Sequence, residues 1–193
     1  MANILILGGG FGGLIAAENL ASALGSEHQI TLVSKSRKFI FYPALVQVAF
    51  GKFKPADISF DLRKKLSGIG VRFKEGEAVR IDTESRLISV AKEDYTIDVS
   101  YDYLVIASGR RLATEKTPGF YEHAHHLLGV EAALKFGAAV KDFRGGRIVV
   151  GMCPGAYLPV PACETAFALA RRFEAEISVK KVSITVVFPE TVR

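Results

Sequence analysis

The sequence is poor in cysteine, with only Cys153 and Cys163. Two thiols cannot form the disulfide framework on which small secreted proteins depend for stability. They lie ten residues apart, so each is either a packed, unreactive side chain or part of a redox site.

Long apolar runs and low-complexity segments are also missing. No stretch approaches the roughly twenty apolar residues that a membrane-spanning helix needs. The chain starts directly in an apolar segment, without a basic region and cleavage site, so we expect no signal peptide. With 49% hydrophobic residues for a core, these features predict a folded cytoplasmic protein.

Charge of one sign is not concentrated anywhere in the chain. The formal net charge is +5, but the basic clusters, such as Lys35-Ser36-Arg37-Lys38, are short. Aromatic residues do not alternate with them to form a base-stacking platform, so we predict no nucleic-acid partner.

What the sequence does contain is a strand, helix, strand pattern at its start. Residues 3–7 and 29–33 are apolar runs typical of strands buried in a parallel sheet. Between them, residues 14–24 carry apolar side chains at helical spacing. Residues 34–57 then lack either periodicity, and we expect a loop-rich insertion that packs over another part of the protein.

A second set of segments has the alternation of apolar and polar residues that is typical of exposed strands, and it predicts a small antiparallel meander. These segments are residues 71–73, 78–81, 87–90 and 95–99. After them, another buried strand is expected at residues 103–107.

The first strand ends in the glycine-rich run Gly8-Gly9-Gly10-Phe11-Gly12-Gly13, which contains G-x-G-x-x-G. The first glycine of this motif allows a tight turn, the second lets a pyrophosphate approach the backbone, and the third lets the helix pack on the sheet. Amides at the start of the helix then face the phosphate charge. The acidic residue that normally meets the ribose is replaced by Ser34-Lys35, and a serine can still hydrogen-bond a hydroxyl.

Together with other segments, this run resembles the FAD domain of pyridine nucleotide-disulfide oxidoreductases over the whole chain. Within that superfamily the sequence is most similar to sulfide:quinone oxidoreductases and type II NADH dehydrogenases, flavoproteins of the membrane surface that reduce quinone. The segments that carry the resemblance are Val33-Ser34-Lys35-Ser36, Phe41-Tyr42-Pro43, residues 76–82, residues 101–109, residues 143–151 and Pro161-Ala162-Cys163-Glu164.

The resemblance implies an α/β fold: a Rossmann-like, three-layer FAD-binding domain with an inserted antiparallel meander, then the start of a second Rossmann-like domain. The implied boundaries are 1–110 for the first part of the FAD-binding domain, 111–128 for a linker and 129–193 for an incomplete second domain. In the second domain we expect only two parallel strands, at residues 147–151 and 182–188. Two strands cannot bury both faces of a sheet, so we expect a fragment of a longer protein that is inactive by itself.

The resemblance also implies roles for individual residues. Ser34 and Lys35 would flank the adenosine ribose, Ala78 would offer its backbone to adenine, and Pro43 would approach the flavin. The remaining residues would wrap the pyrophosphate or close over the dinucleotide: Gly8, Gly10, Phe11, Gly12, Gly13, Ala107, Ser108 and Gly109.

Where an NAD-binding relative has a second G-x-G-x-x-G, this chain has a stretch rich in proline after Gly151. Proline removes amide donors that a pyrophosphate needs, which makes NAD(H) doubtful. Sulfide oxidation needs paired cysteines near the flavin, yet Leu158 stands where the thiol is expected. Cys153 or Cys163 would have to act instead, and the alternative for both is a buried, inert thiol.

Three histidines, His123, His125 and His126, lie at spacings of two and one on a loop and have no cysteine nearby in the sequence, so we predict no metal site. The leading hypothesis is two-electron transfer through FAD from a small, sulfide-type reductant to quinone or another acceptor. The alternatives are an NADH dehydrogenase or oxidase using the same FAD, and a non-catalytic nucleotide-binding remnant. A full-length protein would sit at the inner face of the membrane through its C-terminal region, and we leave open whether it forms homo-oligomers.

Overall fold

The computed structural model describes residues 1–109, 115, 117–156 and 158–189, and these fall into two compact units. The first unit contains Met1–Ile40 and the chain from Ser59 through strand β9 (Tyr103–Ile106). The second contains Phe41–Ile58 and the described residues from 115 onward. The insertion after Ile40 is therefore grouped with the later part of the chain, although it interrupts the first unit in sequence.

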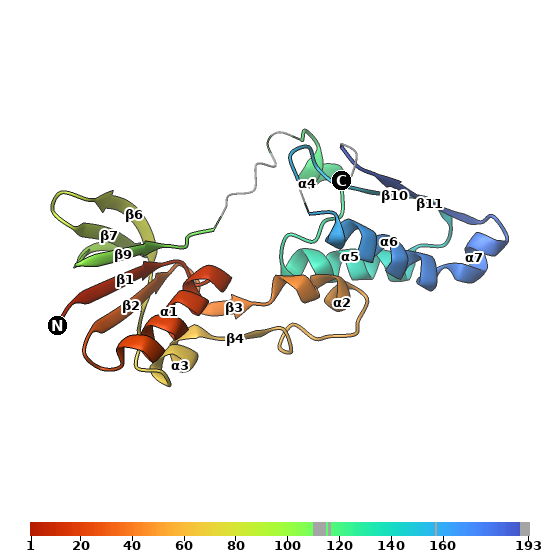
Figure 1. The fold of residues 1–193 in the computed structure, drawn as a ribbon. Coiled ribbons are helices and arrows are strands. Elements are labelled where there is room, and N and C mark those ends of the chain that lie inside the picture. The colour runs from red at the N-terminus through yellow and green to blue at the C-terminus, as the bar shows by residue number, and fades with distance from the viewer. Residues whose placement is uncertain (110–114, 116, 157, 190–193) are drawn as a thin grey trace. The chain divides into compact units, whose positions relative to one another are not determined.

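The first unit is built on a four-stranded parallel sheet (Figure 1). Its strand order is β5-β2-β1-β9, with β1 at Asn3–Leu7, β2 at Gln29–Ser34 and β5 at Arg72–Glu75. We expected residues 71–73 to belong to the meander, and this prediction was wrong because β5 pairs in parallel with β2. From β1 the chain continues to β2 and β5 on one side of that strand, and it later returns to the other side as β9. The boundary between β1 and β9 is therefore a topological switch point.

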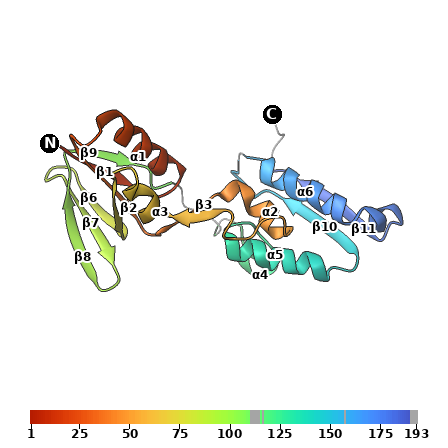
Figure 2. The ribbon, with the colours of Figure 1, turned by 90° about the horizontal axis from the view of Figure 1, so that it is seen from below.

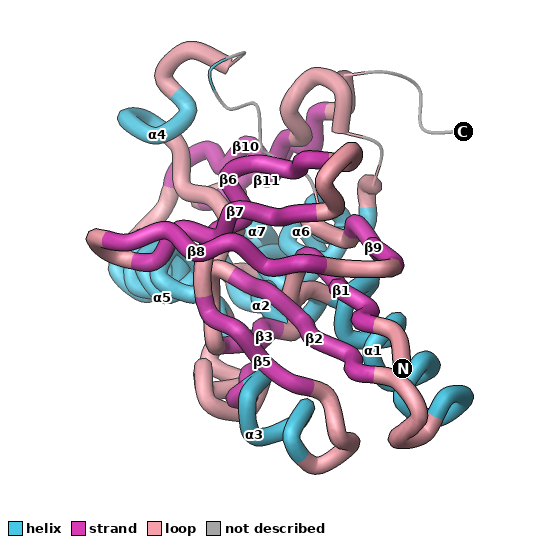
Figure 3. The backbone as a smooth tube through the Cα atoms, turned by 90° about the vertical axis from the view of Figure 1, so that its left-hand side faces the viewer, coloured by secondary structure: helices cyan, strands magenta, loops and turns pink. Residues whose placement is uncertain are grey.

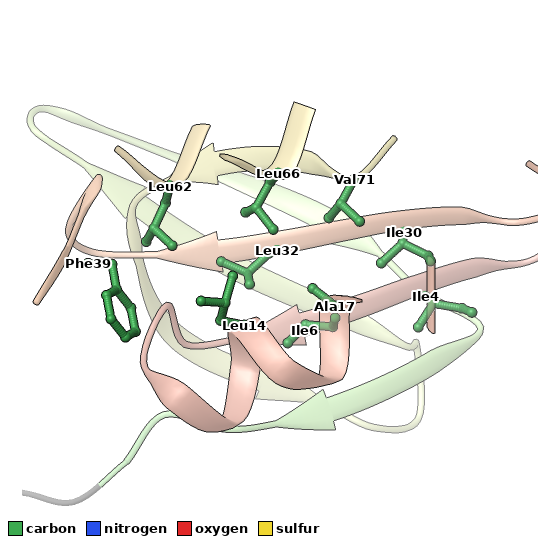
Figure 4. Packing of buried hydrophobic residues seen from close by; sticks show 10 residues of the cluster. All are labelled: Ile4, Ile6, Leu14, Ala17, Ile30, Leu32, Phe39, Leu62, Leu66 and Val71. Atoms are coloured by element: carbon green, nitrogen blue, oxygen red, sulfur yellow. The ribbon is translucent and has the colours of Figure 1, made fainter. Parts of the chain in front are cut away.

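Helices α1 (Phe11–Leu24) and α3 (Leu62–Ser67) cover one face of this sheet. Alternate residues of β1 point to that face, because successive side chains of a strand project to opposite sides. Figure 4 shows the resulting core, in which Leu14 of α1 and Leu62 of α3 reach the side chains of the strands. The buried members of this cluster are Ile4, Ile6, Leu14, Ala17, Ile30, Leu32, Phe39, Leu62, Leu66 and Val71.

A three-stranded antiparallel meander covers the other face. It consists of β6 (Glu77–Asp82), β7 (Leu87–Lys92) and β8 (Tyr95–Ser100), seen as neighbouring magenta segments in Figure 3. Leu5 and Leu7 of β1 pack there against Ile88 and Val90 of β7. The predicted fold class is thereby confirmed: helices, a parallel sheet and an inserted meander form three layers.

The insertion after Ile40 is flanked by two short strands and begins with two short helices. Strands β3 (Lys38–Ile40) and β4 (Ser59–Asp61) pair in antiparallel fashion. Between them lie the 3-10 helix η1 (Tyr42–Ala44) and helix α2 (Leu45–Ala49) of the second unit.

The second unit holds the parallel pair β10 (Gly146–Gly151) and β11 (Val182–Val187), with α6 (Val160–Arg172) packed on both strands (Figure 2). Its other helices are α4 (Phe120–His123), α5 (Val130–Asp142) and α7 (Glu174–Ser178). Helix α2 of the insertion packs on α5 so closely that a Cβ on Gly137 would lie 2.3 Å from the Ala49 carbonyl oxygen. The insertion is thus a structural part of this unit's helical layer.

Candidate functional site

The glycine-rich turn between β1 and α1 lies at the carboxyl edge of the parallel sheet. The Gly8 amide donates to the Val33 carbonyl at 2.8 Å, and the Ala107 amide donates to the Leu7 carbonyl at 2.8 Å. Gly8 has φ +113°, and a Cβ there would lie 2.2 Å from the Ala107 carbonyl oxygen. Only glycine therefore lets the turn close against the end of β9.

Two further glycines allow close packing inside the turn. A Cβ on Gly13 would lie 1.8 Å from the Gly8 carbonyl oxygen, so α1 can rest on the turn only without a side chain. A Cβ on Gly9 would lie 2.6 Å from both Leu62 Cδ1 and Ser34 Oγ. Sequence reasoning missed Gly9 because the G-x-G-x-x-G pattern leaves that position open.

Gly10 differs from these glycines because a Cβ added to it would meet no atom within 4 Å. It is the N-terminal cap of α1, with extended backbone at φ −83° and ψ −167°, and the first turn of the helix carries no acidic residue. Amides at the start of a helix point outward and carry partial positive charge, so this open space suits a phosphate group. The residues present therefore fit the diphosphate of a dinucleotide.

The ring of Phe11 is held beside this space by other aromatic side chains. Phe11 contacts Phe39 edge-on, with centroids 5.1 Å apart, and Phe39 stacks on Phe60 at 4.7 Å. Phe39 is 5% exposed, whereas Phe11 is 40% exposed. The buried ring thus anchors the first residue of α1 while leaving it accessible to a ligand.

Ser34 and Lys35 lie at the same edge, where β2 ends. The Ser34 carbonyl accepts a hydrogen bond from the Gly76 amide at 2.9 Å, which ties the end of β2 to the start of β6. Lys35 Nζ forms an ion pair with Glu77 Oε2 at 2.9 Å. Sequence reasoning missed Glu77, since nothing local to it indicates that it meets the end of β2.

The other predicted contacts of the dinucleotide are spread along this rim. Ala107, Ser108 and Gly109 follow β9, and Gly109 has a positive φ of +77°. Ala78 pairs with Val90, and a β-bulge follows it between Ala78 and Arg80. Their roles toward a cofactor stay predictions.

Pro43 lies in the second unit, in the first turn of η1. The two units are separate compact bodies, so its predicted approach to the flavin also stays a prediction. In the same unit, Gln47 Nε2 of α2 donates a hydrogen bond to Glu164 Oε1 of α6.

Both cysteines are free thiols, and each is half-buried. Cys153 lies in the connection between β10 and α6, and Cys163 lies in the first turn of α6, where its amide donates to the Pro159 carbonyl at 3.0 Å. Helix α6 has a proline near its first position and proline as its N-terminal cap. The prolines of this connection, Pro154 and Pro159, and Pro161 in the first turn of the helix, each lack an N–H that could donate to an anion.

Two of the histidines after Pro118-Gly119 contact aromatic rings. His126 stacks on Phe120 with centroids 5.2 Å apart, and its Nδ1 accepts a hydrogen bond from the Leu128 amide at 3.3 Å. His125 lies 6.1 Å from the Phe136 ring. Among the described residues, no three His, Cys, Asp or Glu side chains gather where they could hold a metal ion. The predicted linker falls partly outside the described residues.

Asp61 supports the site indirectly. It is the N-terminal cap of α3, the helix that brings Leu62 against Gly9, and its carboxylate accepts from the Lys64 amide at 3.0 Å. That hydrogen bond, with a smaller contribution from Arg37, lowers the pKa of Asp61 below its ordinary value. Within the described part of the chain, no helix has the length and apolar character to cross a bilayer.

Comparison with known proteins agrees with this architecture. A sulfide-quinone reductase of Aquifex aeolicus is 31% identical over 174 residues, which are 89% of this chain and 39% of that relative. The solved structure of the sulfide:quinone oxidoreductase from the same organism superimposes with a TM-score of 0.89 at 30% identity, covering 98% of this chain and 44% of that one.

A second relative is the external alternative NAD(P)H-ubiquinone oxidoreductase B1 of Solanum tuberosum mitochondria. It is 31% identical over 161 residues, which are 77% of this chain and 27% of the relative. The chain thus spans less than half the length of the relatives it matches. The sequence also matches, over residues 2–180, the family described as pyridine nucleotide-disulphide oxidoreductase. The predicted resemblance is confirmed, and the chain belongs to the pyridine nucleotide-disulphide oxidoreductase family.

Proposed function

We propose that this chain binds FAD and serves an oxidoreductase that passes two electrons from a small reductant to quinone or another acceptor. The observation that carries the proposal is the glycine-rich turn, in which a Cβ on Gly8, Gly9 or Gly13 would clash with neighbouring atoms while a Cβ on Gly10 would face open space. The similarity to a sulfide-quinone reductase and to an NAD(P)H-ubiquinone oxidoreductase supports a redox role with quinone as acceptor.

In this proposal the chain binds and orients the cofactor, while bound flavin supplies the two-electron chemistry. The turn from Gly8 to Gly13 would hold the diphosphate at the start of α1. Ser34 and Lys35 would meet the ribose, and Ala107, Ser108 and Gly109 would close over the dinucleotide from the end of β9. Ala78 would present its backbone to adenine.

A donor without a diphosphate group is favoured over NAD(H). The β10–α6 connection contains Pro154 and Pro159, and Pro161 stands in the first turn of α6. Each proline lacks the N–H that a second dinucleotide would need. Sulfide needs no such site, but it needs a reactive thiol, for which Cys153 and Cys163 are the available candidates.

The test is to purify the full-length protein that contains this chain, record its flavin absorbance and add sulfide or NADH anaerobically, followed by a soluble ubiquinone analogue. We expect yellow protein that sulfide bleaches and quinone re-oxidises. Replacing Cys163 or Cys153 by serine should stop bleaching by sulfide if that thiol reacts. Bleaching by NADH alone would favour the dehydrogenase alternative. Colourless protein that takes up no added FAD would leave only a nucleotide-binding or structural role.

A further inference from the structure

The edge of the sheet where the ribose of a dinucleotide would lie has no carboxylate at the usual position. In dinucleotide-binding folds an acidic residue at the end of the second strand accepts hydrogen bonds from the ribose hydroxyls. Here β2 ends at Ser34 and is followed by Lys35. Lysine only donates hydrogen bonds, so it cannot replace the missing acceptor.

Ser34 is a limited substitute because its side chain is already engaged. Its Oγ accepts a hydrogen bond from the Ser36 amide at 3.4 Å. The same oxygen packs so closely on Gly9 that a Cβ added to that glycine would be 2.6 Å away. A neutral hydroxyl also makes a weaker acceptor than a carboxylate, since hydrogen bonds to charged groups are stronger.

Two carboxylates follow on the neighbouring segment, and they differ in environment. Glu75 ends β5 and is paired with Lys92 at 3.4 Å, with both side chains about one-third exposed. Glu77 begins β6 and is more open, with its side chain 55% exposed and its Oε2 2.9 Å from Lys35 Nζ. The backbone holds the two segments together, because the Gly76 amide donates to the Ser34 carbonyl at 2.9 Å.

We propose that Glu77, held by Lys35, supplies the ribose-binding carboxylate that the end of β2 lacks. This inference rests on the proposed binding of FAD and adds a specificity-determining residue to it. The ion pair brings a carboxylate from β6 to the end of β2, next to the glycine-rich turn. One carboxylate oxygen faces Lys35, and the other can accept the 2′-hydroxyl of the adenosine ribose.

An exposed ion pair contributes little to folding stability. Replacing Glu77 by glutamine, which keeps the shape and removes the charge, should therefore leave the melting temperature almost unchanged. FAD affinity, in contrast, should fall by about tenfold or more, as expected for losing a charge-assisted hydrogen bond. The matched control is Glu84→Gln, an exposed glutamate in the turn between β6 and β7, which should leave FAD affinity unchanged.

The experiment is a titration of the protein with FAD, followed by flavin fluorescence, and its displacement by ADP or 2′-deoxy-ADP. The unaltered protein and Glu84→Gln should prefer ADP, and Glu77→Gln should lose that preference because the hydroxyl and the carboxylate act as one pair. Equal FAD affinity and an unchanged preference in Glu77→Gln would overturn the inference while leaving FAD binding intact. An unaltered protein that binds no FAD would overturn the proposed function itself.

Discussion

The sharpest test of the glycine-rich turn is to add one methyl group at each of two glycines. In Gly13→Ala the new Cβ would lie 1.8 Å from the Gly8 carbonyl oxygen, whereas real Cβ atoms essentially never approach within 3.0 Å. The two atoms would have to separate by about 1.2 Å, which requires a backbone shift in a packed core because one is a carbonyl oxygen and the other is bonded directly to a Cα. We expect a destabilisation of about 1–3 kcal/mol, as for other overpacked sites, together with loss of FAD binding.

Gly10→Ala is the matched variant, because the same methyl group there meets no protein atom within 4 Å. Its backbone, at φ −83° and ψ −167°, is one that alanine adopts without strain. Stability should change by less than about 1 kcal/mol, because the restriction that alanine places on the unfolded chain is offset by its weaker preference for an N-terminal cap. FAD affinity should nevertheless fall, because the methyl group would occupy the space proposed for the diphosphate.

The two measurements are urea unfolding and FAD titration of the same preparations. The expected pattern is loss of both properties in Gly13→Ala and loss of binding alone in Gly10→Ala. Unchanged stability of Gly13→Ala would refute the contact argument for α1. Normal FAD binding by Gly10→Ala would refute the placement of the diphosphate at this helix start.

Three other predictions concern packing and pH. Gly137→Ala should lower unfolding free energy by about 1–3 kcal/mol in urea, because its Cβ would meet the Ala49 carbonyl oxygen at 2.3 Å; a stability gain from alanine's helix propensity would contradict this. Leu62→Ala removes a side chain that is 0% exposed and should cost about 2–5 kcal/mol in the same assay. Asp61 has a lowered pKa in the folded protein, so its stabilising effect is complete above its unfolded pKa and is lost as pH falls through the folded value. Between neutral and acid pH, the melting temperature should fall less in Asp61→Asn than in the unaltered protein. An equal fall in both proteins would contradict a stabilising effect of the ionised Asp61 side chain.

The parts of the fold that sequence predicted are those set by local sterics and periodicity. The turn from Gly8 to Gly13 was predictable because tight turns and close helix packing both exclude side chains. The apolar runs of β1 and β2 likewise indicated a sheet covered on both faces. The meander was recognised from alternation, which depends only on residues two apart.

The parts that sequence did not predict depend on partners far along the chain. Strand β5 has a short pattern that fits either sheet, and only its pairing with β2 decides between them. Residues 41–58 gave no periodicity because their helix α2 is short and packs on α5. Glu77 was missed because its proposed role depends on an ion pair with Lys35. The two residues are distant in sequence, but Lys35 Nζ lies 2.9 Å from Glu77 Oε2.

The contrast between the two strand-to-helix connections bears on the electron donor. After β1, three glycines lead directly into α1, with Gly10 as N-terminal cap. After β10, residues 152–159 intervene, Pro159 is the cap and a second proline occupies the first turn of α6. A diphosphate needs amide donors and close backbone approach, which the first connection offers and the second restricts. This asymmetry between the two connections is the reason we propose a small donor in place of NAD(H).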